Sequence, residues 1–448
     1  MDKNIYEEKS LNELIFMFGV PSILALIIEM LTSVADTYFA GHIPIGGDTA
    51  LSAMAILSPL LSSFTALQTL FAMSSGILMA KYLNDSKIQY QCLLVGVFMS
   101  MLISAIVSFV CAVWIDPILY FIGADGQIYS LAKEYLRIHL ISNVISSVGY
   151  TLTCCIRAIG YPKIEMIIII VAVIINIISN AIFTFGLNMG ISGLAFGTLV
   201  SELVCACAAI IFLIKKNIWR GITYPSFSKI ILLATEMFKI GFAQTVIQIL
   251  SGCSGFFVNI RLLSLGNTVS VAAWNVAQRI YILLLMPIVG LTQGIQTIIA
   301  YFGGIGEEEK VQKISKLAHI YCACYGLLAL ILVLFWGDNV VKLFGGNQEI
   351  IKLSNSIVVI IFSCFPIVGI FYTNMTLLQV TGKEMDSVVL ALTRQVFLLL
   401  PLILLIPYLF SATGRSPLIG LFIATPVADI SVVIISMIMK KKSLKKYE

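Results

Sequence analysis

The sequence predicts an all-α integral membrane protein in which about twelve transmembrane helices form two parallel six-helix repeats. Hydrophobic residues make up 59 % of the 448 residues and charged residues only 11 %, whereas a soluble domain carries roughly 25 % charged residues. Apolar runs longer than the ~20 residues needed for one helical crossing recur along the whole chain. Short motifs also reappear in the same order in the two halves of the sequence.

Each long apolar run is expected to form one membrane span. The runs are interrupted by short segments rich in charged residues, Gly and Pro, which mark the loops. The loops are too short to hold a soluble domain. The expected spans are residues 12–40, 50–82, 90–115, 128–156, 163–187, 190–215, 233–263, 268–302, 314–336, 350–379, 385–410 and 415–440.

The charged residues of the loops predict the orientation. Met1–Ser10 is charged and holds no apolar core followed by a cleavage site, so no cleaved signal peptide is expected. Lys and Arg concentrate in alternate loops, and the positive-inside rule then places both termini in the cytoplasm. The net charge of +5 reflects this bias rather than nucleic-acid binding. The basic residues expected on the outer side are Lys133, Arg137, Arg261, Lys342, Lys352 and Arg415.

The two halves of the chain are similar at an interval of about 220 residues. Met17–Pro21 resembles Met237–Gly241, and Gly193–Thr198 resembles Gly420–Thr425. Because each half contains an even number of spans, both halves start on the same side and the repeats are parallel. Parallel repeats are a known plan of transporters that bind substrate between their halves. We expect an N-terminal lobe at 1–215, a cytoplasmic linker at 216–230 and a C-terminal lobe at 231–448.

Asp36 is the most informative residue, because it lies inside the first apolar run. A charged side chain at the centre of a membrane helix costs about 2.5–3.5 kcal/mol, so such residues usually face a bundle interior or a water-filled cavity. Helical spacing puts Thr32, Ser33 and Glu29 on the same face of the span. This stripe is therefore a candidate transport site.

The fifth span carries a second polar stripe. Asn176, Asn180 and Thr184 follow one another at steps of four residues in an Ile-rich helix. Together with Asp36 they offer the oxygen ligands that hard cations such as Na⁺ prefer, and burial of Asp36 also favours its protonated form. Interhelical hydrogen bonding is the alternative role of the two Asn residues.

Five further residues are candidates for substrate binding or gating. Arg279 lies within the eighth span and is expected to pair with an acidic residue or with helix-end carbonyls. Pro287 follows in the same span, where a proline permits a bend or simply static packing. Glu202 and Asp429 each follow a threonine by one turn, and interhelical pairing is favoured over substrate contact for both. Gln248 in the seventh span completes the set.

Three runs of the sequence resemble one transporter family. They are Val34–Thr37 followed by Gly41, the run from Arg279 to Gly294, and the run from Arg394 to Asp429. These runs resemble the multidrug and toxic compound extrusion (MATE) transporters, and most of all the prokaryotic DinF-type branch. The resemblance implies a V-shaped two-lobe bundle in the plasma membrane of a bacterium. It also implies antiport, in which H⁺ or Na⁺ enters while an amphipathic organic cation leaves.

The resemblance also implies an ion site in the N-terminal half. Where the family usually has a second aspartate in the fifth span, this chain has Asn180, and Thr32 stands where a Tyr is frequent. The site therefore has one negative charge fewer, which favours proton coupling through Asp36. Glu29 is hypothesised to supply the missing charge. The residues that the resemblance assigns to the site are Asp36, Asn176, Asn180 and Thr198.

Two other classes of function fit the sequence less well. A flippase for a lipid-linked saccharide or lipid precursor needs several cationic residues within the spans to meet a pyrophosphate, and only Arg279 qualifies clearly. The sequence contains no HExxH motif and no nucleophile beside a His, which an intramembrane enzyme would need. It also contains no repeated filter loop, which a channel would need. The ten cysteines lie mostly in apolar spans without metal-site spacing. We therefore expect a non-enzymatic transporter with no cofactor or metal besides its coupling ion, whose partners are a small organic substrate and the bilayer, with no nucleic acid and no obligate protein partner indicated.

Overall fold

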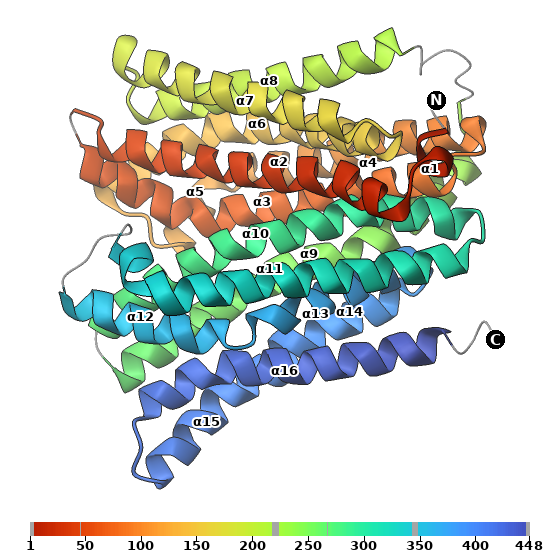
Figure 1. The fold of residues 1–448 in the computed structure, drawn as a ribbon. Helices are drawn as coiled ribbons and strands as arrows, with labels where there is room; N and C mark the ends of the chain where they lie inside the picture. The colour runs from red at the N-terminus through yellow and green to blue at the C-terminus, as the bar shows by residue number, and fades with distance from the viewer. Residues whose placement is uncertain (1–3, 45, 217–223, 267, 343–347, 445–448) are drawn as a thin grey trace. The chain divides into compact units, whose positions relative to one another are not determined.

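The computed structural model describes residues 4–44, 46–216, 224–266, 268–342 and 348–444, without the side chains of 253 and 442–444. The expected linker at 216–230 lies partly outside these residues. Throughout the described ranges the regular structure is helical (Figure 1). The helices are α1 (Asn4–Glu8), α2 (Leu11–Gly41), α3 (Gly47–Lys81), α4 (Ser86–Val113), α5 (Ile115–Phe121), α6 (Gly126–Ala158), α7 (Pro162–Ala181), η1 (Ile182–Gly186), α8 (Ile191–Lys215), α9 (Phe227–Leu265), α10 (Thr268–Gly304), α11 (Glu308–Lys342), α12 (Gln348–Phe362), α13 (Phe365–Val380), α14 (Glu384–Leu392), η2 (Thr393–Leu399), α15 (Leu400–Ala412) and α16 (Pro417–Leu444).

Eleven helices in the described residues are long and apolar enough to cross a membrane, and a twelfth span results when the bent pair α12–α13 is counted as one. This confirms the predicted all-α membrane architecture. The spans are long because few polar residues interrupt them, and an N-capping residue can mark where a loop ends and a helix begins. Asp85, for example, accepts hydrogen bonds from the backbone amides of Lys87 and Ile88 at the start of α4.

The chain folds into two compact units. Unit 1 comprises Met1–Ser10 and Phe16–Thr245, and unit 2 comprises Leu11–Ile15 and Val246–Glu448. The change from one unit to the other along the chain thus falls within α9. The lobe limits expected from the sequence repeat, 1–215 and 231–448, stay a prediction.

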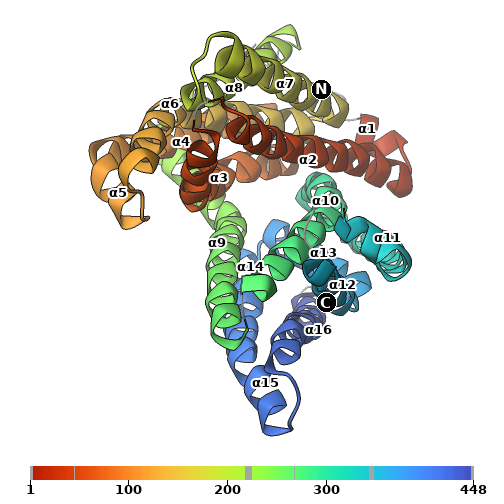
Figure 2. The same ribbon diagram turned by 90° about the vertical axis from the view of Figure 1, so that its left-hand side faces the viewer.

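Unit 1 is a bundle in which α6 packs against α3, α4 and α8, and α7 packs against α8 (Figures 1 and 2). Small residues allow the close approach of these helices. A Cβ atom on Gly96 of α4 would overlap the side chain of Ser75 on α3. Close helix–helix contact at such positions brings polar side chains of neighbouring helices within hydrogen-bonding distance.

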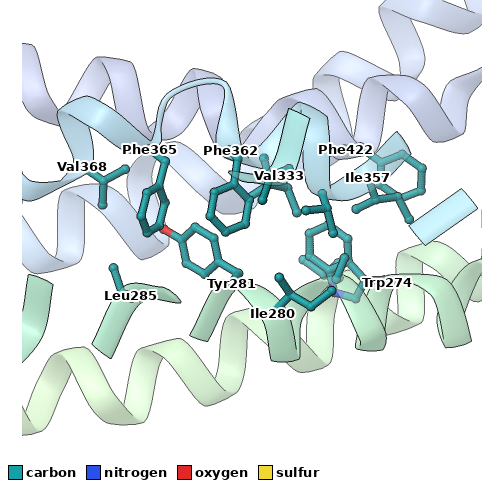
Figure 3. Close-up of a cluster of buried hydrophobic side chains, with 14 of the residues drawn as sticks. Trp274, Ile280, Tyr281, Leu285, Val333, Ile357, Phe362, Phe365, Val368 and Phe422 are labelled. Atoms are coloured by element: carbon teal, nitrogen blue, oxygen red, sulfur yellow. The ribbon is translucent and has the colours of Figure 1, made fainter. Parts of the chain in front are cut away.

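Aromatic rings lie among the aliphatic side chains in the core of unit 2 (Figure 3). The ring of Tyr281 from α10 lies edge-on to Phe362 and Phe365, with ring centroids 5.9 and 5.6 Å apart. Trp274 of α10 stacks on Phe422 of α16 at 5.9 Å. Such aromatic pairs add about 0.5–1.5 kcal/mol to the effect of burial alone. These contacts fix α10 against α12, α13 and α16.

The span expected at 350–379 is not one continuous helix. Its two parts, α12 and α13, meet at an angle of 53°. Pro366 is the cause, because it has no amide hydrogen to donate to the turn before it. The bend leaves room for α11 to approach, since a Cβ atom on Gly326 would lie 2.7 Å from Cα of Pro366. Pro287, by contrast, lies inside the uninterrupted helix α10.

Candidate functional site

The predicted ion site is built on a contact between α2 and α7 in unit 1. The side-chain amide of Asn180 donates a hydrogen bond to Oδ1 of Asp36 at 2.6 Å. The same amide nitrogen donates to Oδ1 of Asn176 at 3.1 Å, and Asn176 in turn donates to Ser201 on α8 at 3.4 Å. Asn176 and Asn180 are fully buried, whereas Asp36 is half-buried. Asp36 is thus the accessible end of a series of hydrogen-bonded side chains that is otherwise buried.

Two glycines of α8 let it approach α7 at this point. A Cβ atom on Gly197 would overlap Oδ1 of Asn180. One turn earlier, a Cβ atom on Gly193 would lie 2.6 Å from the backbone nitrogen of Thr184. Only residues without a side chain fit these positions. The Gly-containing run that the sequence repeat singled out therefore allows α8 to pack closely against Asn180 and Thr184.

A π-helical turn follows Asn180 directly. The turn η1 takes the place of an α-helical turn at Ile182–Gly186, and such turns occur mostly at functional sites. Oδ1 of Asn180 and Oγ1 of Thr184 are buried here without a hydrogen-bond partner in the described part of the chain. An unmet buried acceptor or donor costs about 1–3 kcal/mol. The site thus keeps unused oxygen atoms next to a carboxylate.

The hydrogen bonds of Thr198, in the described part of the protein, join it to residues other than Asp36. Its hydroxyl donates to the carbonyl of Leu194 at 3.1 Å, and Ser201 donates to the carbonyl of Thr198 at 2.8 Å. Tyr135 of α6 hydrogen-bonds with the Thr198 side chain and lies in electrostatic range of Asp36. Sequence reasoning missed Tyr135, because its approach to Thr198 depends on the packing of α6 against α8, which a single sequence does not state.

Glu29 lies apart from Asp36. Seven residues along one helix correspond to about 10.5 Å, and the structure groups Glu29 with Glu202 of α8 and Glu165 of α7. Glu202 accepts a hydrogen bond from Ser146 of α6. Glu29 is exposed, Glu202 is half-buried, and Glu165 is buried and paired with an arginine. Thr32 is half-buried on α2, between the two acidic positions.

In unit 2, the candidate Asp429 of α16 pairs with Arg394, which lies in the first part of the second π-helical turn, η2. Arg394 Nε donates to Oδ1 of Asp429 at 2.9 Å, and both side chains are largely buried. The guanidinium also lies 5.4 Å from the ring centre of Phe371. Oδ2 of Asp429 is buried without a hydrogen-bond partner among the described residues, and the hydroxyl of Tyr281 lies close to the Arg394 guanidinium.

The remaining candidates of unit 2 stand on α9 and α10. Arg279 lies on an exposed face of α10, and Pro287 is half-buried in the same helix. Gln248 is half-buried in α9. The structure therefore does not gather these three residues with Asp429 into one cluster of hydrogen-bonded side chains.

The chain matches the family model described as MatE at residues 21–182 and again at 243–405. It is 24 % identical to the multidrug export protein MepA of Staphylococcus haemolyticus, over 91 % of this chain and 90 % of that protein. Identity to the protein of the same name from Staphylococcus saprophyticus is also 24 %, over 92 % and 91 % of the two chains.

Solved structures share the fold. A mutant of the MATE transporter VcmN from Vibrio cholerae matches with a TM-score of 0.90 at 18 % identity, over 97 % of both chains. A transporter of the MOP superfamily from Pyrococcus furiosus matches with a TM-score of 0.88 at 18 % identity, over 99 % of this chain and 98 % of that one. With the family model covering most of each half and the membrane fold in place, this chain belongs to the MatE family of membrane transporters and is not an enzyme.

Proposed function

We propose that this protein exports amphipathic, drug-like organic compounds across a bacterial plasma membrane, driven by inward movement of a coupling ion that binds at Asp36. The names of its relatives support the substrate class, since those proteins are multidrug exporters. The contact of Asp36 with Asn180 supports the site. Its carboxylate lies in a membrane span, and its hydrogen-bond partner is the side-chain amide of Asn180 rather than a cationic side chain.

We infer that the coupling ion is H⁺ rather than Na⁺. The atom of Asn180 that faces Asp36 is the nitrogen, which donates a hydrogen bond. A Na⁺ ion at this place needs oxygen atoms from both residues, and the donor nitrogen occupies that direction. A single carboxylate accepts one proton without further ligands. Proton binding also removes the charge of Asp36 and so weakens its hydrogen bond with Asn180.

Coupling requires that the ion and the substrate favour different conformations of the transporter. Asp36 joins α2 to α7, so a change in its charge alters the energy of that helix contact. We propose that protonation of Asp36 loosens the contact with Asn180 and favours release of substrate to the outside. Binding of substrate from the cytoplasm then favours the deprotonated state.

The finer assignments belong to the same proposal. Both termini are placed in the cytoplasm on the distribution of Lys and Arg between the loops. The DinF-type branch is proposed on the runs around Asp36, Arg279 and Arg394. Amphipathic cations are the proposed substrates, because acidic side chains outnumber basic ones around Glu29.

Reconstituted vesicles loaded with a cationic dye test this function. Wild-type protein is expected to release dye when a pH gradient is imposed, and Asp36→Asn is expected to reduce the gradient-dependent rate at least tenfold. Asp48→Asn, which makes the same chemical change outside the site, serves as the control. Efflux that persists unchanged in Asp36→Asn overturns the site, and efflux driven only by a Na⁺ gradient overturns proton coupling.

A further inference from the structure

A groove of about 540 Å³ lies on the surface of unit 1 between α4 and α6. On α4 it is lined mainly by small side chains, spaced so that they share one face of the helix. The hollow results from the missing volume at these positions. The lining residues are Ala105, Ser108, Phe109 and Ala112 of α4, and Arg137, Leu140, Ile141, Val144 and Ile145 of α6.

The interior of the groove is apolar. Its one hydroxyl, that of Ser108, already accepts a hydrogen bond of 2.9 Å from the side-chain amide of Asn143. The remaining lining is aliphatic or aromatic, apart from Arg137. The volume falls in the range of about 300–1,000 Å³ typical of sites for small ligands. A hydrocarbon chain suits this interior, whereas a polar solute finds no partner within it.

One end of the groove is positively charged. Arg137 is exposed and forms no ion pair within the described parts of the chain. The carboxylate in its electrostatic range, Asp116, is already bound to Lys133 at 2.5 Å and to the hydroxyl of Tyr129 at 2.6 Å. Glu134 is also engaged, because it accepts a hydrogen bond from Ser192. Arg137 therefore remains available to an external anion.

The charged end lies where an aromatic belt marks the membrane surface. Ala112 is followed almost at once by Trp114 and then by α5, and the side chains of Trp114 and Phe121 are 61 % and 92 % exposed. Tyr120 of α5 stacks on Tyr129 of α6 at 4.9 Å. Exposed Trp and Tyr typically lie at the level of lipid headgroups. The groove thus runs from headgroup level into the hydrocarbon region.

We propose that this groove binds one anionic phospholipid, with its phosphate on Arg137 and an acyl chain between α4 and α6. The positive charge of the arginine complements the negative charge of the phosphate, and the apolar lining suits the acyl chain. Organic cations of the proposed substrate class are repelled by Arg137, so this site is separate from the transport path. The proposal does not depend on the proposed function.

Native mass spectrometry of the purified transporter tests it. The protein is titrated with phosphatidylglycerol and with phosphatidylcholine of identical chains. One tightly bound phosphatidylglycerol is expected, with affinity about fivefold above that of phosphatidylcholine, since one basic side chain near an anionic headgroup has an effect of this size. Arg137→Gln is expected to abolish the difference between the two lipids. Arg415→Gln, which removes an exposed arginine elsewhere, is expected to leave it unchanged.

A second variant tests the part of the groove that is proposed to hold the acyl chain. Ala105 lines the apolar part of the groove, so Ala105→Phe fills that part and is expected to weaken the binding of both lipids equally. Equal affinity of the wild type for the two lipids overturns the proposal, as does unchanged selectivity in Arg137→Gln. A dimer in the spectrum that Ala105→Phe dissociates assigns the groove to a second copy of the chain instead.

Discussion

Asn180 donates its side-chain amide to Asp36 over 2.6 Å, although the two residues are 144 positions apart in the sequence. The contact is direct, and the same nitrogen continues the chain to Asn176. A charge change at Asp36 is therefore transmitted to α7 without an intervening side chain. Several measurable consequences follow from this arrangement and from the packing around it.

Asn180→Asp is expected to change the coupling ion. The substitution replaces the donor nitrogen with an oxygen and adds a second carboxylate beside Asp36, which gives a cation more oxygen ligands and more negative charge. Dye efflux at constant pH should become dependent on an imposed Na⁺ gradient. Asn188→Asp, made in the loop between η1 and α8, is the control. A variant that still responds only to pH contradicts the proposed role of the donor nitrogen.

Gly197→Ala is expected to disrupt the site by overpacking. The new methyl group would overlap Oδ1 of Asn180, and overpacking of a close contact costs about 1–3 kcal/mol. Both the Tm in detergent and the gradient-driven efflux should fall. Gly303→Ala places a methyl group in open space and should leave both unchanged. Wild-type efflux by Gly197→Ala would show that α8 need not approach Asn180 so closely.

Glu29→Gln is expected to affect substrate binding rather than ion coupling. Glu29 is exposed and lies in a group of three carboxylates with one arginine, so its charge attracts cationic solutes. The KM for a cationic dye should rise several-fold, whereas the response to a pH gradient should persist. Glu202→Gln is a matched comparison at a less accessible carboxylate. Loss of pH coupling in Glu29→Gln would instead support the hypothesis that Glu29 replaces the missing charge at Asn180.

Arg394→Met is expected to destabilise unit 2. Removing one partner of a buried ion pair leaves an uncompensated charge and costs about 3–5 kcal/mol, and Asp429 is buried next to Arg394. The double variant Arg394→Met/Asp429→Leu should recover most of the lost stability. Thermal unfolding in detergent measures both. Equal stability of the single variant and the wild type would mean that Asp429 finds another partner.

Acid is expected to loosen α5. The hydrogen bond from Lys133 and that from Tyr129 lower the pKa of Asp116 below its ordinary value, and Arg137 acts in the same direction. A lowered pKa stabilises the fold at pH values above the ordinary Asp value of about 3.9. This contribution disappears as the pH falls through the lowered pKa. Fluorescence of Trp114 in a variant without the other tryptophans should report the change, and Asp116→Asn should remove its pH dependence.

The sequence predicted the spans well because long apolar runs leave a chain few alternatives in a membrane. Prolines such as Pro366 mark places where a span can bend, but the sequence did not state which of them breaks its helix, because a bend and static packing are both compatible with a proline. The short helix α5 was also missed, because its composition merges with the preceding span. These failures concern changes of direction, which depend on backbone hydrogen bonds rather than on hydrophobicity.

For the candidate site, the sequence predicted only the polar residues that recur at helical spacing within one span. Asp36, Asn176 and Asn180 were identified as polar groups in apolar helices, and the structure brings them together. The role of Tyr135, and the lack of space for a side chain at Gly197, depend on which helices are neighbours. A single sequence does not state this. Glu29 was linked to Asp36 because both share one face of α2, but distance along the axis separates them.

The π-helical turn η2 changes how residue positions beyond Arg394 must be interpreted. Such a turn holds one residue more than the α-helical turn it replaces, so α15, which follows it directly, is rotated by roughly 100° relative to an ideal wheel. A cysteine-accessibility scan along residues 384–412 that assumes 3.6 residues per turn throughout would assign the positions after Leu399 to the wrong face. The wheel has to be restarted at Leu400.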